Sequence, residues 1–83
     1  MPKIFTWKGY KFFFYANEGK PLEICHIHVR KGKCTAKFWL EPDVALASSY
    51  GLSGKDLNEI RKVIIENQEI IRRAWNEFFK RGG

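Results

Sequence analysis

The sequence predicts an α+β domain in which an antiparallel sheet of four or five strands, connected as a meander, packs one face against a bent C-terminal helix. The sheet is predicted because strand-like runs flank a Lys-Gly dipeptide twice, at Lys8-Gly9 and at Lys31-Gly32. The helix is predicted because apolar residues recur at three- and four-residue steps from Leu57 to Phe78. An apolar sheet face and an apolar helix stripe then bury each other.

The length of the chain sets the size of this domain. With 83 residues, we expect a single domain over 1–83, with a β-rich sheet region over 1–47 and a helical region over 53–80. No apolar run approaches the roughly 18 residues of a membrane span, and no stretch resembles a secretory signal. We therefore expect a cytoplasmic protein that does not enter a membrane.

The first predicted hairpin joins Lys3–Trp7 to Tyr10–Ala16 through the Lys8-Gly9 loop. Alternation places Phe5, Trp7, Tyr10, Phe12 and Phe14 on one face and Ile4, Thr6, Lys11, Phe13 and Tyr15 on the other. Because both faces are largely apolar, we expect the strand with Phe12–Phe14 to lie inside the sheet, with the helix on one side and aromatic rings on the other. Asn17–Pro21 is a predicted turn.

The second predicted hairpin, Ile24–Leu40, contains both histidines and both cysteines. If Arg30 pairs with Lys33 across a Lys31-Gly32 loop, Val29 faces Cys34. The apolar face then holds Cys25, Ile27, Val29, Cys34, Ala36 and Phe38, and the polar face holds His26, His28, Arg30, Lys33, Thr35 and Lys37, with Ile24 and Trp39 at its end. A slip by one residue would mix the two sets, so the pattern selects this parity. The two cysteines lie about 13 Å apart along one face and are expected to be free thiols.

The remaining chain is predicted from turn and capping residues. Glu41-Pro42-Asp43 ends the hairpin because proline has no amide donor for a sheet. Residues 44–47 are either a short edge strand or a first helical turn, and Ser48–Gly51 is expected to be a loop. Ser53 is the expected N-cap of the helix. Asn67 falls on its apolar face, so we expect a bend there and a second segment over 68–79, before a frayed Gly82-Gly83 end.

Several segments, in one order and spacing over nearly the whole chain, resemble a known family. They are Phe12–Glu18, His26–Val29, Ala36–Pro42, Glu66-Asn67 and Trp75–Phe79. In these segments the chain is similar to the small bacterial proteins of the DUF4160 family, which has no assigned function. Members resemble toxin–antitoxin-type small proteins in size and in often being encoded beside another small protein. The resemblance therefore implies a small partner protein encoded nearby.

Three interpretations of the histidines remain open. Residues two apart on a strand point the same way, so His26 and His28 are predicted to sit roughly 7 Å apart on one face. A metal site lacks ligands, because both cysteines face the opposite side, and no metal or other cofactor is expected. In a metal-independent ribonuclease, one imidazole would accept a proton and the other donate one, while Lys37 stabilised the charged intermediate. The third interpretation is a polar pair on a solvent-exposed sheet face.

Charge and aromatic content favour binding over catalysis. The formal net charge is +6, and residues 1–52 carry the larger part of it. Cations beside aromatic rings suit phosphates and bases, and also the centres of protein interfaces. We expect a non-enzymatic binding protein that engages a partner protein or nucleic acid through His26, His28, Arg30, Lys33, Lys37 and Trp39. The sequence does not predict the oligomeric state.

Overall fold

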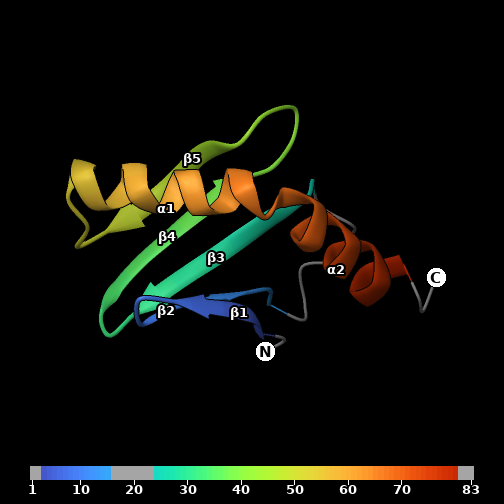
Figure 1. The fold of residues 1–83 in the computed structure, drawn as a ribbon, viewed down its shortest axis with the longest axis horizontal. Helices are drawn as coiled ribbons and strands as arrows, with labels where there is room; N and C mark the ends of the chain where they lie inside the picture. The colour runs from blue at the N-terminus through green and yellow to red at the C-terminus, as the bar shows by residue number, and fades with distance from the viewer. Residues whose placement is uncertain (1–2, 16–23, 81–83) are drawn as a thin grey trace.

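The computed structural model describes residues 3–15 and 24–80 and confirms the α+β architecture (Figure 1). The strands are β1 (Lys3–Trp7), β2 (Tyr10–Phe13), β3 (His26–Lys31), β4 (Cys34–Trp39) and β5 (Ala45–Tyr50), and the helices are α1 (Gly54–Glu66) and α2 (Gln68–Lys80). The sheet order is β1-β2-β3-β4-β5 with every pair antiparallel, which is the predicted meander. The turn expected over Asn17–Pro21 and the frayed end expected at Gly82-Gly83 lie outside the described residues.

The two Lys-Gly sites form different turns. In the first hairpin Trp7 pairs with Tyr10, so Lys8-Gly9 is the loop as predicted. Both loop residues have positive φ, 48° and 83°, as a type I′ turn requires. In the second hairpin Lys31 pairs with Cys34, so the loop is Gly32-Lys33 and the expected Lys31-Gly32 loop is wrong.

The position of glycine explains the second turn. Gly32 has φ +59° at the first loop position, the place where a type II′ turn needs glycine. A type I′ turn at Lys31-Gly32 would instead have required a positive φ at Lys31; Lys8 adopts this conformation in the first hairpin at φ 48°, but a side chain disfavours it, and the second hairpin places Gly32 there instead. The pairing therefore shifts by two residues: Val29 lies opposite Ala36 and Ile27 opposite Phe38, not opposite Cys34 and Ala36. A shift of two keeps every side chain on its predicted face.

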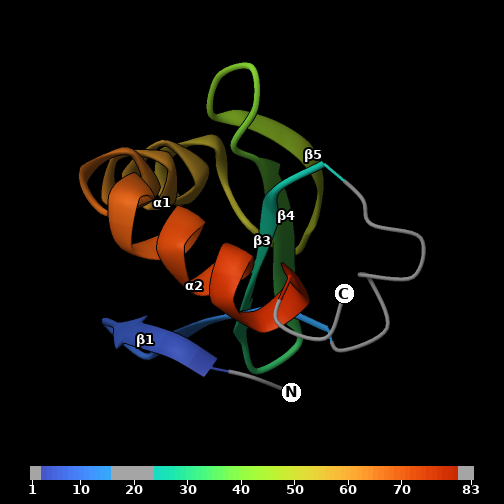
Figure 2. The same ribbon diagram turned by 90° about the vertical axis from the view of Figure 1, so that its right-hand side faces the viewer.

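One face of the sheet is buried under both helices, as predicted (Figure 2). From the strands and the residues that directly adjoin them, this core takes the fully or nearly fully buried side chains of Phe12, Phe14, Cys25, Ile27, Val29, Ala36, Phe38 and Leu40. From the helices it takes Ile60, Val63, Ile64, Ile71 and Trp75. Strand β2 has neighbours on both sides, with Phe12 on the helix side and Phe13 on the other.

Residues 45–50 form the edge strand β5, so the loop expected from Ser48 is wrong. The sheet therefore extends past 47: Ser49 pairs with Ala36 and Tyr50 with Thr35, while Ala47 is the extra residue at a register shift. All six residues of β5 are exposed, and none is charged. Three apolar residues followed by Ser-Ser-Tyr, all of them exposed, leave no alternation that would have predicted a strand.

The two helices begin and end where the polar residues predict. The Ser53 hydroxyl accepts a hydrogen bond from the Asp56 amide (3.1 Å), and the Asp56 carboxylate accepts one from the Ser53 amide (3.5 Å), a capping box at the start of α1. The predicted bend at Asn67 is confirmed, because α1 ends at Glu66 and α2 begins at Gln68. Its side-chain amide donates to the Val63 carbonyl (2.8 Å), so the side chain satisfies the end of α1 and the backbone carbonyl starts α2 by accepting from Ile71 (3.0 Å).

Trp75 connects α2 to the sheet, and its truncation tests this packing. Only 4% of the residue is exposed, and its ring lies 5.1 Å from Phe14 and 4.9 Å from His26, centroid to centroid. Trp75→Ala is expected to lower the free energy of unfolding by about 3–5 kcal/mol, because removal of the buried ring loses its burial free energy and leaves a cavity that the neighbouring side chains fill only in part. Urea denaturation measures the loss. Phe78→Ala, at a ring that is 41% exposed, is the control and should lose much less. Equal losses would contradict the placement of Trp75.

The two cysteines differ in environment, which predicts different reactivity. Both are free thiols, as expected. Burial raises the pKa of the Cys25 thiol to about 11; Glu41 raises it further and Arg72 opposes the rise. At pH 8 only about one Cys25 in a thousand is then a thiolate, the reactive form. Cys34 is half-buried, and its thiol donates to the Gly51 carbonyl at 3.3 Å.

We therefore expect a disulfide reagent such as Ellman's reagent to modify Cys34 in the folded chain and Cys25 only after unfolding. Cys34→Ser is the control, and it should not react with the reagent until denaturant is added. The raised pKa also makes stability depend on pH: above about pH 9 the folded state holds the Cys25 proton more tightly than the unfolded state, so this thiol lowers the free energy of unfolding as pH rises towards 11. Equal rates for both native thiols would overturn this prediction.

Candidate nucleic-acid interface

The sheet face opposite the described helices carries cations, imidazoles and aromatic rings in cross-strand rows. We call it the cationic face, and it comprises Lys11, Phe13, His26, His28, Arg30, Thr35, Lys37, Trp39, Ser48 and Tyr50. One row is Lys11, Arg30, Thr35 and Tyr50, the next is Phe13, His28, Lys37 and Ser48, and the third pairs His26 with Trp39. Successive rows lie about 7 Å apart, because they are two strand residues apart. Each row therefore offers at least one group that can contact a phosphate or a base.

The five strands contain no Asp or Glu, so no strand carboxylate neutralises this face. In the described part of the chain, the acidic residues lie in the 41–43 connection and on the helices. Two of them act on the helix side of the sheet: burial raises the pKa of the Tyr10 hydroxyl, and Asp56, Cys34 and Glu59 raise it further. Negative charge is thus concentrated away from the cationic face.

Lys11 and Arg30 are direct cross-strand partners, two exposed cations side by side. They border an open hollow of about 290 Å³ near the tips of the two hairpins, which is lined by Gly9, Lys11, Phe13, Arg30, Lys31 and Gly32. The Arg30 Nε donates to the Gly32 carbonyl (3.2 Å), which holds the guanidinium beside the turn. The Lys31 ammonium points to the helix side, where it lies 5.0 Å from the centroid of the Tyr10 ring. The hollow therefore presents two cations, Lys11 and Arg30, beside Phe13, which suits a phosphate more than an apolar ligand.

His26 is fully buried, so the expectation that its ring is exposed on the sheet face is wrong. Trp75 from α2 lies 4.9 Å from the ring, Trp39 lies 5.4 Å and His28 5.2 Å from it, measured between centroids. The His26 Nδ1 lies 2.7 Å from the Ile24 carbonyl, which can only accept, so Nδ1 carries the proton. His26 is therefore a packing residue at the end of the sheet.

The neighbouring rings continue this cluster towards the surface. His28 is half-buried, stacks on Phe13 at 5.7 Å and meets Tyr15 edge-on at 4.5 Å. Trp39 is half-buried, and the Lys37 ammonium lies 4.4 Å from its ring centroid, a cation–π contact. These contacts orient His28, Lys37 and Trp39 on the cationic face.

The structure brings most of the sequence-predicted binding residues together. His28, Arg30, Lys37 and Trp39 share one face, with His26 beneath them. Lys33 does not occupy the strand position expected for it; it lies exposed in the β3–β4 turn.

Four residues of the cationic face were not predicted to share it: Lys11, Phe13, Ser48 and Tyr50. Lys11 joins it because β2 pairs with β3, and Tyr50, 70% exposed, joins it because β5 is a strand. The parity of Lys11 within its own hairpin was a usable signal. The first hairpin could not be aligned with the second, because no sequence pattern determines the β2–β3 register.

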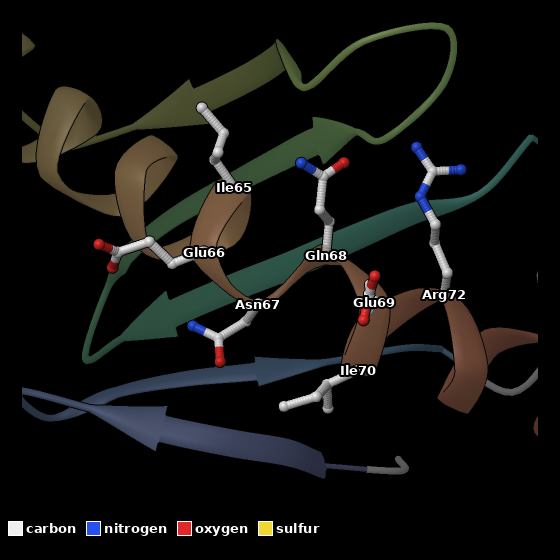
Figure 3. Close-up of a pocket in the computed structure, with 7 residues that line it drawn as sticks. All are labelled: Ile65, Glu66, Asn67, Gln68, Glu69, Ile70 and Arg72. Carbon is white, nitrogen blue, oxygen red and sulfur yellow. The ribbon is translucent and has the colours of Figure 1, made fainter.

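A second hollow, of about 650 Å³, lies at the α1–α2 bend (Figure 3). Its lining residues are Ile65, Glu66, Asn67, Gln68, Glu69, Ile70 and Arg72. Arg72 already has structural partners, since its guanidinium contacts the Glu41 carboxylate (3.1 Å) and donates to the Leu40 carbonyl (2.6 Å). These contacts tie α2 to the end of β4, so the groups at this hollow serve the fold.

Neither a metal site nor a membrane span is found in the part of the chain that the structure describes. Within residues 3–15 and 24–80, His, Cys, Asp and Glu side chains do not gather in groups of three or more that could hold a metal ion. No helix among these residues has both the length and the apolar character needed to cross a bilayer.

Comparison with known proteins identifies the family. No curated protein and no solved structure shows significant similarity to the chain. The family model described as a domain of unknown function, DUF4160, matches residues 9–76, from the first hairpin turn to the residue after Trp75. This match covers most of the chain, including strands β2 to β5 and the α1–α2 bend, so the protein belongs to the DUF4160 family.

Proposed function

We propose that this protein is a non-enzymatic binding protein that holds single-stranded nucleic acid on its cationic face. The proposal depends mainly on one observation: Lys11 and Arg30 lie directly opposite each other in a sheet whose strands carry no carboxylate. Like charges directly opposite each other destabilise a sheet. A bound polyanion would attract both cations and offset the repulsion between them.

The positions of the phosphate-binding groups support the proposal. Lys11 and Arg30 border the hollow at the hairpin tips, and Lys37 lies two residues along from Thr35, in the next row. A nucleic-acid backbone that enters the hollow can therefore continue along the face towards Lys37. Lys33, exposed in the adjacent turn, adds positive charge at the rim.

The aromatic residues support a single-stranded ligand over a duplex. Tyr50 is 70% exposed at the end of the Lys11 row, and Trp39 lies one row beyond Lys37. Bases of single strands stack on such rings, whereas the bases of a duplex already stack on each other. In this arrangement His28 orients the neighbouring groups, and His26 supports them from below.

The burial of His26 weighs against the ribonuclease alternative. Acid–base catalysis with His26, His28 and Lys37 would require both imidazoles to reach the RNA, and the exposed fraction of His26 is 0%. A partner protein encoded nearby, as in a toxin–antitoxin pair, is the other alternative, and it would have to be acidic to match this face. The free thiols fit the reducing cytoplasm, where we place the protein.

Replacement of Lys11 separates binding from stability. Lys11→Thr removes the repulsion from Arg30, so its free energy of unfolding should stay equal or rise by a few tenths of a kcal/mol. Its affinity for a labelled uridine oligonucleotide should nevertheless fall, and log K should depend less steeply on log salt, by about 0.7 for one lost phosphate contact. Fluorescence anisotropy across a salt series and urea denaturation measure the two effects.

Arg61→Ala, at an exposed cation on α1, is the matched control and should leave both affinity and salt slope unchanged. Equal losses for the two variants would mean that net charge alone drives binding. Absence of oligonucleotide binding by the parent chain, or metal-free RNA cleavage that is lost in His28→Ala, would overturn the proposed function.

Removal of the Tyr50 ring tests base stacking. Tyr50→Ala is expected to weaken oligonucleotide binding by about 1–3 kcal/mol, the range for one stacked base. The salt slope should not change, because no phosphate contact is lost. Phe78→Ala removes an exposed ring on α2 and should leave affinity intact. If Tyr50→Ala changed the slope of log K against log salt and left the affinity at fixed salt unchanged, Tyr50 would have to contact the phosphates of the nucleic acid and not a base.

A further inference from the structure

The edge strand β5 presents an uncharged backbone at the side of the sheet. It pairs with β4 on one side only, and no other strand of the described residues lies beside it. Its sequence, Ala-Leu-Ala-Ser-Ser-Tyr, is exposed at all six positions and contains neither a charged residue nor proline. Edge strands are usually protected by charges or proline against pairing with another chain. Here the register shift at Ala47 is the one protective irregularity.

We propose that β5 is a homodimer interface, at which two copies of this chain pair edge to edge and antiparallel about a two-fold axis near Ala47 and Ser48. The result is one sheet of two chains with the two cationic faces on the same side. The proposal rests on the edge itself and does not depend on what the cationic face binds.

Charge argues for a second copy as the occupant. The chain carries a net charge of +6, so two copies repel wherever their cations meet. Each of the other four strands contains at least one Lys or Arg, and β5 contains none. Of the two edge strands of the sheet, β1 carries Lys3 and β5 carries no charge, so β5 can lie against its own copy without bringing a strand cation to the interface.

The apolar surface beside β5 adds contact area. Leu46 is 44% exposed on β5, and Ile65, 37% exposed, extends from α1 on the side of β4 and β5 (Figure 3). In a two-fold arrangement each of these side chains approaches the corresponding surface of the second copy. Backbone hydrogen bonds from β5 then combine with burial of these apolar groups, and such small interfaces are typical of weak or transient dimers.

The oligomeric state of charge variants at Ala47 tests the interface. Ala47 has no partner on β4, so a new side chain there disturbs the sheet little. The parent chain should reach twice its 9.8 kDa mass in sedimentation experiments from micromolar to millimolar concentration. Ala47→Lys and Ala47→Glu should each be monomeric, because two like charges meet at the axis. An equimolar mixture of the two variants should recover the dimer mass, which also shows that both are folded.

The matched control is Thr6→Glu, at an exposed position on the opposite edge strand, and it should remain dimeric. The dimer should persist at high salt with the ratio of absorbance at 260 nm to that at 280 nm of a protein free of nucleic acid, unlike a complex bridged by nucleic acid. A parent chain that is monomeric throughout the range would overturn the proposal, even if it binds another protein. Ala47 variants that both stay dimeric, or a mixture that stays monomeric, would overturn it as well.

Discussion

Ile27 and Val29 on β3 and Ala36 and Phe38 on β4 are buried under the two helices, and this burial fixes the parity of the two central strands. The four side chains pair across the two strands, so neither strand can slip by one residue without moving charged side chains into the core. Burial of one face also determines which side chains face outward. His28, Arg30, Thr35 and Lys37 are on the cationic face because their neighbours in sequence are in the core.

The bend at Asn67 allows the two consecutive helices, α1 and α2, to cover a wide sheet. A straight helix would follow one direction across five twisted strands. With the bend, α1 contributes Ile60 and Ile64 to the core, and α2 turns to bring Ile71 and Trp75 over Phe14 and the start of β3. The contact of Arg72 with Glu41 and Leu40 then attaches α2 to the end of β4. The same placement of Trp75 encloses the ring of His26.

Local patterns predicted the architecture and the faces, because alternation and capping act over a few residues. The parity of β3 and β4, the Ser53 cap and the Asn67 bend are all of this kind. The exact β3–β4 loop was not predicted, since a shift of two residues keeps the parity and only the φ preference of Gly32 distinguishes the alternatives.

The errors in the candidate site arise from contacts distant in sequence. His26 was expected to be exposed because its strand position is polar, but Trp75, far along the chain, packs on it. Lys11 was not assigned to the same face as Arg30 because the β2–β3 pairing joins two hairpins whose relative register no alternation determines. Tyr50 was assigned to a loop because β5 has no buried face. A local pattern carries no information about these contacts.

The cationic face is positively charged and the β5 edge is uncharged, and the two proposals therefore assign them different partners. Repulsion between Lys11 and Arg30 makes the face a poor surface for self-association and a good one for an anion. The absence of charge on β5 makes the edge suitable for a second copy and unsuitable for a polyanion. Pairing at β5 would bring the Tyr50 rings of two chains to the middle of one continuous face, with a Lys11–Arg30 pair on either side. A strand of nucleic acid crossing that face would then meet cations, rings and cations again, so each interaction would strengthen the other through linkage, without any change in the fold.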